Sequence, residues 1–474
     1  MTHLAIIGAG AAGIAGLQAA IKQGRADEIT LVDSRRPAQG LAFGVSHRRY
    51  LCNTSTPVMS IDAEKPDDYS AWLRARGKDS GTDTFTPRIE FSAYLSDAYQ
   101  RCLQQAAAAG IRVGHLNRNA DSIRPEGGSG FTLRCGDETL TVDKVLLALG
   151  DTVPNIPEAY SHMREAETFF VTPFDARCED FLSQGQARNV LILGTSLTAI
   201  DAAKACLDHG ARAVMTSPSG RLPSVRSEFT PLSPAPMTRE QFADLVAAPD
   251  SFAENILRWI DAYGRDCGIP LDAQVTHADG EGARLAEEVE LAAEGKSLWQ
   301  YFIGETQGHL NREMPWLAAD VRKILFDQIS QWPGGYMTAM PLANGRILAE
   351  ACAQKQFAVC QLPERIEAHG SGWQVKWADG STEEFSAVIC AAGFSTPRLS
   401  LAGDELRIGT SSGGTTVQPA SRLSMSTDLF GAQTPPIGVL GSLTSSFYPF
   451  ANFMKSVADQ APAALEGLFS EQPD

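Results

Sequence analysis

Long apolar segments are missing from the sequence. No stretch approaches the roughly 18 consecutive apolar residues that a membrane-spanning helix needs. An apolar strand is predicted to begin within the first few residues, which leaves no space for the charged and apolar parts of a signal peptide. We therefore expect no membrane partner and a cytoplasmic location.

Positive charge is also scarce. The 474 residues include 40 Lys and Arg against 56 Asp and Glu, which gives a formal net charge of -16, and no long basic run is present. A nucleic-acid-binding protein needs a basic surface to displace the counterions of the phosphate backbone. Nucleic acid is therefore excluded as a partner. The length is sufficient for two or three folded domains.

Paired cysteines and clustered histidines are absent as well. The nine cysteines are scattered without a Cys-x-x-Cys pair, and the eight histidines are equally dispersed. A dithiol relay needs two neighbouring thiols, and a metal site needs several ligands at suitable spacing. We expect free, mostly buried thiols and no bound metal.

The clearest motif present is a glycine-rich turn near the amino terminus. Residues 4–7 predict a buried strand, and Gly8, Gly10 and Gly13 follow at the start of an alanine-rich helix. This G-x-G-x-x-G spacing permits a tight turn, close approach of a pyrophosphate and close packing of helix on strand. A second apolar run ends at Asp33, whose carboxylate can accept hydrogen bonds from an adenosine ribose. Together these residues predict a dinucleotide site.

The segment that follows is longer than the quick return to a third strand in a simple NAD dehydrogenase. It contains Leu51-Cys52-Asn53, Met59-Ser60, Trp72-Leu73, Pro87-Arg88-Ile89-Glu90-Phe91 and Tyr94-Leu95. These residues resemble the two-dinucleotide flavoproteins. Within them they resemble a bacterial FAD/NAD(P)-binding family distantly similar to ornithine and lysine N-hydroxylases and to amino-acid N-oxygenases such as nitrosuccinate synthase.

The resemblance implies that the first site holds FAD and that Asn53, Met59 and Arg88 lie in the segment that wraps the flavin. An ion pair between Arg88 and Glu90 at a helix start is the alternative for Arg88. Residues 110–151 and 356–397 also repeat one order of strands and turns. By the same resemblance, Gly150 and Gly393 are the points where each repeat crosses near a cofactor.

A second strand, turn and helix is predicted at residues 190–203, where Gly194, Ser196 and Ala199 replace the three glycines. With FAD in the first site, this turn would present a helix amino terminus to the pyrophosphate of a nicotinamide cofactor. A purely structural turn is the alternative.

The end of the next predicted strand indicates which nicotinamide cofactor is used. Ser217, Ser219 and Arg221 stand where an NAD-specific protein places Asp or Glu, so a ribose 2′-phosphate would meet no carboxylate. We therefore expect NADPH. Arg226 is a further candidate for the phosphate, and a solvated loop is the alternative for both arginines.

Residues from about 231 to 331 have apolar positions at helical spacing, which predicts amphipathic helices inserted into the second domain as a lid. Trp299, Trp316 and Trp332 are expected in its core. The tail predicts a strand at 437–440, a turn at Gly441-Ser442 and a final helix. The resemblance implies that Gly441 and Ser442 contact the flavin, while capping by Ser445 or Ser446 is the alternative.

The predicted fold class is α/β, with two Rossmann-like dinucleotide-binding domains and an inserted helical segment. The expected boundaries are 1–185 for the first part of the FAD domain, 186–380 for the NAD(P) domain with its insert, and 381–474 for the return to the FAD domain.

Two bound dinucleotides without a cysteine pair imply that electrons leave the flavin by another route. We expect an FAD-dependent, NADPH-using monooxygenase that uses O2 to N-oxygenate an amino acid or amine through a peroxyflavin. The alternatives are a reductase that passes electrons to a quinone or iron protein, and a non-catalytic dinucleotide-binding sensor. No catalytic side chain is identified, and the oligomeric state, including a homo-oligomer, stays open.

Overall fold

The computed structural model describes residues 1–474 except 46, 79–84, 128–129, 186, 228–236, 332–333, 410–413, 426–428, 431–433 and 471–474. Within the described residues, no helix is sufficiently long and apolar to cross a bilayer. The same residues hold no group of three His, Cys, Asp or Glu side chains that could bind a metal ion.

The two ends of the chain build one parallel sheet. Its strand order is β3 (Arg112–Leu116), β2 (Glu28–Val32), β1 (His3–Ile7), β7 (Lys144–Leu147) and β23 (Ile437–Val439). The central strands are almost wholly apolar and buried, as expected for a sheet covered on both faces. The predicted tail strand therefore completes the amino-terminal sheet.

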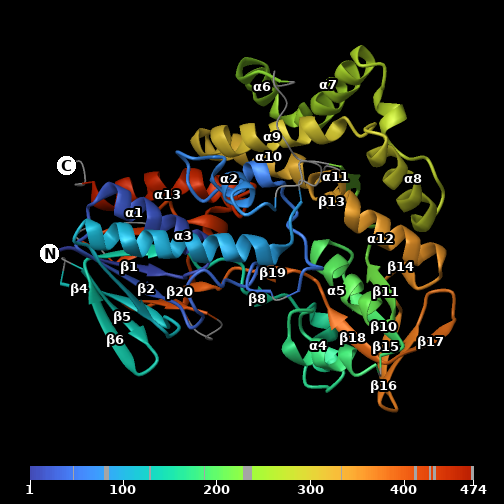
Figure 1. Ribbon diagram of the computed structural model, residues 1–474, viewed down its shortest axis with the longest axis horizontal. Helices are drawn as coiled ribbons and strands as arrows, with labels where there is room; N and C mark the ends of the chain where they lie inside the picture. The colour runs from blue at the N-terminus through green and yellow to red at the C-terminus, as the bar shows by residue number, and fades with distance from the viewer. Residues whose placement is uncertain are drawn as a thin grey trace.

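Three helices cover one face of this sheet, and Figure 1 shows two of them, from opposite ends of the chain, side by side. They are α1 (Ala11–Gln23), α3 (Arg88–Ala108) and α13 (Met454–Phe469), with the short α2 (Asp68–Arg74) beside α3. The side chain of Gln23 donates to the carbonyl of Pro462 at 2.9 Å, which ties α1 to α13.

An antiparallel sheet covers the other face. Its order is β22 (Thr415–Thr416), β20 (Leu399–Ala402), β21 (Glu405–Ile408), β4 (Ser122–Glu126), β5 (Gly130–Cys135) and β6 (Glu138–Val142). Ile123, Phe131 and Leu133 from this sheet pack against Ile7 and Leu147 of the parallel sheet.

The second unit repeats the first. Its parallel sheet has the order β14 (Phe357–Gln361), β11 (Arg212–Ser217), β10 (Asn189–Leu193), β18 (Ala387–Cys390) and β9 (Phe169–Phe170). An antiparallel sheet of β15 (Arg365–His369), β16 (Gly372–Lys376) and β17 (Thr382–Phe385) lies between β14 and β18 in the sequence, as β4 to β6 lie between β3 and β7. The repeat predicted from the sequence is confirmed.

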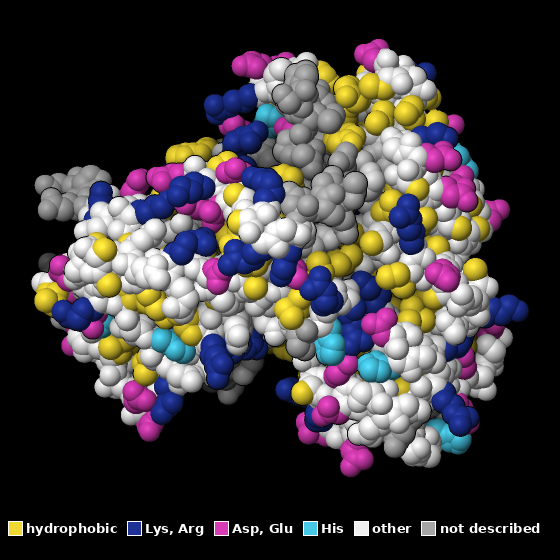
Figure 2. Space-filling model, viewed as in Figure 1, with side chains coloured by type: hydrophobic (Ala, Val, Ile, Leu, Met, Phe, Trp, Pro, Cys, Tyr) yellow, Lys and Arg dark blue, Asp and Glu magenta, His cyan; other side chains and the backbone are white. Residues whose placement is uncertain are grey.

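Helices α4 (Ala176–Ser183), α5 (Leu197–Asp208) and α12 (Leu342–Ala353) belong to this second unit. The chain passes between the units at the paired strands β8 (Val153–Pro154) and β19 (Phe394–Ser395). Strand pairing thus places β9 and β18 in the second sheet, outside the expected boundaries at 185 and 380. Figure 2 shows a hollow between the lobe that carries β4 to β6 and the lobe that carries α4.

The predicted helical insert stands above both units in Figure 1. Its helices are α6 (Arg239–Val246), α7 (Phe252–Asp266), α8 (Glu281–Ala293), α9 (Trp299–Glu313), α10 (Ala319–Gln331) and α11 (Gly334–Met337). The chain leaves the second unit after β12 (Val225–Arg226) and returns at β13 (Met340–Pro341), and these two strands pair with each other.

The prediction that three tryptophans of the insert are buried in its core holds for only one of the two that the structure describes. Trp299 is buried, as predicted. The prediction for Trp316 is wrong, because this side chain is 69% exposed and its ring lies beneath the guanidinium of Arg422. Trp332 lies outside the described residues.

Candidate functional site

A cavity of about 860 Å³ lies at the carboxyl-terminal edge of the first sheet. The turn between β1 and α1, the ends of β2 and β7 and the start of α13 form its walls. Six of the predicted cofactor residues line it: Gly8, Gly10, Asp33, Gly150, Gly441 and Ser442. The volume lies within the range of about 300–1,000 Å³ that is usual for cofactor sites.

Backbone contacts explain why the first turn requires glycine. Gly8 has φ +100°, and a Cβ atom there would lie 2.3 Å from the carbonyl oxygen of Ala148. A Cβ on Gly13 would lie 1.9 Å from the carbonyl oxygen of Gly8. Gly13 therefore permits helix packing and does not line the cavity. The amino terminus of α1 is left facing the cavity, where its N–H groups could donate to an anionic group.

The carboxylate of Asp33 is held in place at the end of β2. One oxygen accepts from the backbone N–H of Ala9 at 2.8 Å, and the other accepts from the N–H of Arg35 at 2.8 Å. A carboxylate oxygen accepts more than one hydrogen bond, so both retain capacity for ribose hydroxyls. The geometry fits an adenosine ribose at this position.

The opposite end of the cavity is formed by the return of the chain from β23. Gly441 has φ +70°, and its N–H donates to Oε1 of Gln460 at 3.2 Å. The hydroxyl of Ser442 donates to Asp151 at 2.8 Å, and Thr396 donates to the other oxygen of this carboxylate at 2.8 Å. Asp151 lines the cavity and was missed in the sequence, where only its neighbour Gly150 was singled out.

The alternative role of Ser445 and Ser446 as helix caps is wrong. Helix α13 begins only at Met454, with Phe453 at the capping position, because a 3-10 turn at Gly441–Thr444 and a further loop come between. The Gly441–Thr444 turn, rather than a serine cap, thus forms this end of the cavity.

Four predicted residues lie away from the cavity wall: Asn53, Met59, Arg88 and Gly393. Met59 packs in the hydrophobic core of the first unit. Gly393 has φ +85° and its carbonyl accepts from the N–H of Asn155 at 3.0 Å, where the chain crosses between the units. Asn53 and Arg88 belong to a contact between the units.

Three cationic side chains donate to alternate carbonyls of the segment 49–53, an arrangement that we call the carbonyl clamp. Lys204 and Arg226 are buried, and Arg88 is partly buried. Lys204 donates to the carbonyl of Arg49, Arg88 to that of Leu51 at 3.0 Å, and Arg226 to that of Asn53. Lys204 and Arg226 belong to the second unit, whereas the segment belongs to the first. The clamp therefore fixes the Asn53 segment against the second unit.

A carboxylate of the second unit accompanies the cations of the clamp. Arg88 forms an ion pair with Asp201 of α5 at 2.7 Å, so the predicted pair with Glu90 is replaced by one that joins the two units. Burial raises the pKa of the Asp201 carboxyl, while Arg88 and Lys204 oppose that shift. Burial also lowers the pKa of Lys204 to about 8, although Asp201 acts in the other direction. Lys204 further donates to the side chain of Asn344 at 2.6 Å.

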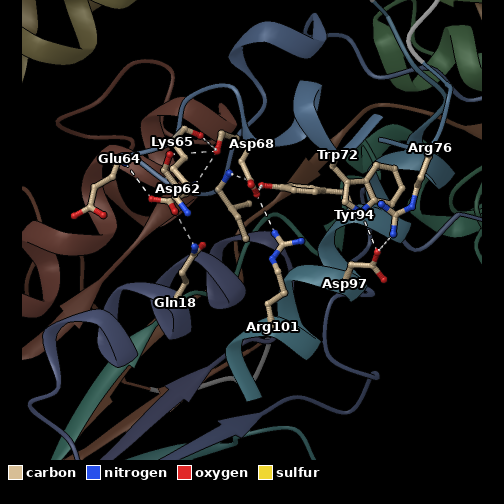
Figure 3. Close-up of polar contacts among 12 residues, drawn as sticks. Gln18, Asp62, Glu64, Lys65, Asp68, Trp72, Arg76, Tyr94, Asp97 and Arg101 are labelled. Carbon is tan, nitrogen blue, oxygen red and sulfur yellow. Dashed lines mark hydrogen bonds and ion pairs between the residues drawn. The ribbon is translucent and has the colours of Figure 1, made fainter. Parts of the chain in front are cut away.

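The excursion that carries this segment is anchored by polar contacts between α2 and α3 (Figure 3). The hydroxyl of Tyr94 donates to Asp68 at 2.9 Å, and Arg101 donates to the same carboxylate at 2.9 Å. Trp72 donates to Asp97 at 2.9 Å. These contacts hold the two helices in register.

The second turn copies the geometry of the first. Gly8 N–H donates to the Val32 carbonyl at 2.8 Å, and Gly194 N–H donates to the Thr216 carbonyl at 2.8 Å. Gly194 has φ +128°, and a Cβ there would lie 2.4 Å from the Ala391 carbonyl oxygen. Ser196 takes the place of Gly10 at the start of α5, and its side chain makes no capping bond. The hydroxyl of Ser196 is thus not used to cap α5.

The correspondence also aligns the residues that select the cofactor. Asp33 follows Val32 in the first unit, and Ser217 follows Thr216 in the second. The hydroxyl of Ser217 accepts from Thr195 at 3.0 Å and from the N–H of Gly220 at 3.1 Å. The loop continues through Ser219 to Arg221, whose N–H donates to the Ser219 hydroxyl at 3.3 Å. Arg226, in contrast, is engaged in the carbonyl clamp.

Two parallel sheets, each with a glycine turn at its carboxyl edge, define the fold of two-dinucleotide FAD- and NAD(P)-dependent oxidoreductases. Residues 5–152 match a family model described as FAD-NAD(P)-binding, which makes this part of the chain an FAD-NAD(P)-binding domain. No curated protein matches the sequence.

Solved structures share the fold over the whole chain. One is an ornithine N-hydroxylase from Kutzneria sp. 744, in complex with reduced FAD, NADP+ and L-ornithine, with a TM-score of 0.57, 14% identity and 99% of each chain covered. Another is L-lysine 6-monooxygenase from Pseudomonas syringae, with a TM-score of 0.54, 16% identity, and 99% of this chain and 100% of that chain covered.

Proposed function

We propose that the chain is an NADPH-dependent flavin monooxygenase that oxygenates the nitrogen of an amino acid or amine. FAD binds in the 860 Å³ cavity, and NADPH binds at the Gly194 turn. The observation that carries this proposal is the duplicated turn with Asp33 in one copy and Ser217 in the other. The first copy suits an unmodified ribose, and the second suits a ribose 2′-phosphate.

The two units contribute binding and positioning. The amino termini of α1 and α5 face the pyrophosphates, and the Asp33 carboxylate accepts from the adenosine ribose. The side-chain oxygen of Asn53 is buried and has no partner among the described residues, so it is available to accept an N–H of the flavin ring. The carbonyl clamp holds this asparagine where the two units meet.

The overall reaction balances with one oxygen molecule. NADPH, a proton, O2 and the substrate yield NADP+, water and a substrate that carries one added oxygen atom. Bound FAD supplies the hydride acceptor and the site at which O2 is activated. Helix α10 of the insert forms one wall of an open cleft of about 600 Å³ that reaches Ser442 at the end of the FAD cavity.

The deciding experiment is rapid mixing of the NADPH-reduced, FAD-loaded protein with oxygenated buffer. We expect a transient absorbance spectrum that differs from those of oxidised and reduced flavin, and that decays faster when the correct amine is added. Direct reoxidation without a transient, together with rapid transfer to a quinone or an iron protein, would instead identify a reductase.

A further inference from the structure

Another cavity, of about 330 Å³, lies between α9 of the insert and α13 of the first unit. We call it the α9–α13 cavity. Thr54, the residue after Asn53, contributes to its wall, and so does Gln460, whose side chain accepts from the N–H of Gly441. The cavity therefore adjoins the flavin end at two points. One is the peptide bond between Asn53 and Thr54, and the other is the hydrogen bond between Gly441 and Gln460. The volume of the α9–α13 cavity is in the range of small-molecule sites.

The wall of this cavity contains a buried acceptor without a partner. Gln307 is 2% exposed, and its amide nitrogen donates to the carbonyl of Met337 at 3.0 Å. Its oxygen has no hydrogen-bond partner within the part of the chain that the structure describes. Leaving a buried acceptor unpaired costs about 1–3 kcal/mol. A ligand N–H or O–H at this point would remove that cost.

Charged residues occupy a different side of the cavity. Arg312 and Arg422 line it, and no described carboxylate lies within 4.0 Å of either guanidinium. Lys455 and Asp459 also line it, but they pair with each other at 2.8 Å. Glu305 also lines it and is only partly exposed. Burial raises the pKa of the Glu305 carboxyl and the charge of Arg312 opposes that shift, so the two groups act on each other. The arrangement matches a ligand head that carries both a carboxylate and an ammonium group.

Helix periodicity separates these two sets of groups. At 3.6 residues per turn, Gln307 and Arg312 are about 140° apart around α9, whereas Glu305 and Arg312 are nearly aligned. Gln307 therefore lies at one edge of the helix face that lines the cavity, and Glu305 and Arg312 lie at the other edge. Three aromatic residues, Tyr301, Tyr448 and Phe453, also line the cavity. Aromatic walls favour an apolar, flat group on the ligand.

We propose that the α9–α13 cavity binds an amino acid with an aromatic side chain that ends in a hydrogen-bond donor. Its carboxylate pairs with Arg312 and Arg422, its ammonium group with Glu305, and its donor with Gln307. The inference rests on the proposed function, because the cavity adjoins the flavin end through Thr54 and Gln460. A side chain ending in an ammonium group is disfavoured, since the acceptor at the buried end is the neutral amide oxygen of Gln307.

The test is calorimetric titration of the FAD-loaded protein with L-tyrosine, L-phenylalanine and L-lysine. We expect L-tyrosine to bind at least tenfold more tightly than L-lysine, and more tightly than L-phenylalanine. Gln307→Leu should remove the preference for tyrosine over phenylalanine, and Arg312→Gln should weaken both by at least tenfold. Gln307→Glu should shift the preference towards L-lysine.

The matched control is Arg258→Gln on α7, an exposed arginine whose pairing with Glu254 is remote from the cavity. The proposal is overturned if L-lysine binds as tightly as L-tyrosine, if no probe binds saturably, or if Gln307→Leu and Arg312→Gln behave as the control does. Flavin reduction by NADPH, followed in the same samples, separates the two proposals. Failure of reduction overturns the proposed oxygenation, whereas unaltered reduction with lost selectivity for tyrosine overturns only the ligand assignment.

Discussion

At the residue scale, the proposed preference for NADPH depends on the side chain that follows the second strand of each unit. Ser217 occupies this position in the second unit, with its hydroxyl directed to Thr195 and Gly220. We expect Ser217→Asp to raise the Kd for NADPH at least tenfold, which is about 1.4 kcal/mol, because a carboxylate would face the 2′-phosphate. Binding of NADH should change less. Flavin reduction rates at increasing concentrations of each cofactor provide the measurement.

The control for this substitution is Ser183→Asp, which adds the same charge at an exposed site on the last turn of α4. FAD content should stay the same in both variants, since Asp33 and the first turn are untouched. An equal loss of NADPH and NADH binding in Ser217→Asp would show that the residue does not discriminate between them.

At the element scale, the pairing of α2 with α3 depends on a buried phenol. Tyr94 is fully buried, and Asp68 accepts from its hydroxyl. We expect Asp68→Ala to lower the free energy of unfolding by about 1–3 kcal/mol, because the hydroxyl loses its acceptor. Urea unfolding followed by flavin fluorescence measures the change.

A double variant isolates the cause. Adding Tyr94→Phe to Asp68→Ala removes the unpaired hydroxyl and should recover part of the lost stability. The control Asp67→Ala removes an exposed carboxylate that lies 3.8 Å from Arg74, and should cost less than about 0.5 kcal/mol. If the two single aspartate variants lose equal stability, the buried hydroxyl is not the reason.

The elements that the sequence predicts well are those with strict local requirements. Gly8 and Gly194 stand where a Cβ would strike a carbonyl, and the apolar strands before them have few alternatives. Long-range partners were not predictable in the same way. Local sequence patterns do not indicate how distant elements pack against each other. For this reason the sequence did not predict the ion pair between Arg88 and Asp201, or that Asp151 and Gln307 line cavities. Trp316 was misassigned because its aromatic character indicates burial, whereas its place in a short turn leaves it exposed.

At the scale of the whole molecule, the carbonyl clamp makes stability depend on pH through Lys204. Its pKa is about 8 in the folded protein and 10.5 without burial, so the unfolded chain binds more protons between these pH values. Stability attributable to this residue therefore rises with pH over that interval. We expect the unfolding free energy of the wild type minus that of Lys204→Met to increase by about 2 kcal/mol from pH 7 to pH 10.

Chemical unfolding of both proteins at the two pH values measures this difference in unfolding free energy. Other titrating groups contribute equally to both proteins, so their contributions cancel. Lys455→Met, which removes an exposed lysine paired with Asp459, is the control and should give no such increase. A constant difference between the wild type and Lys204→Met would mean that this lysine is hydrated in the folded protein.

The return of the chain to the first unit sets an order on biosynthesis. Strand β23 and helix α13 follow the second unit and the insert in the sequence, so the first sheet gains its edge strand and the cavity its final wall only after both have been synthesised. The second unit and the insert can therefore complete their cores first. Flavin capture is expected after the second unit has folded.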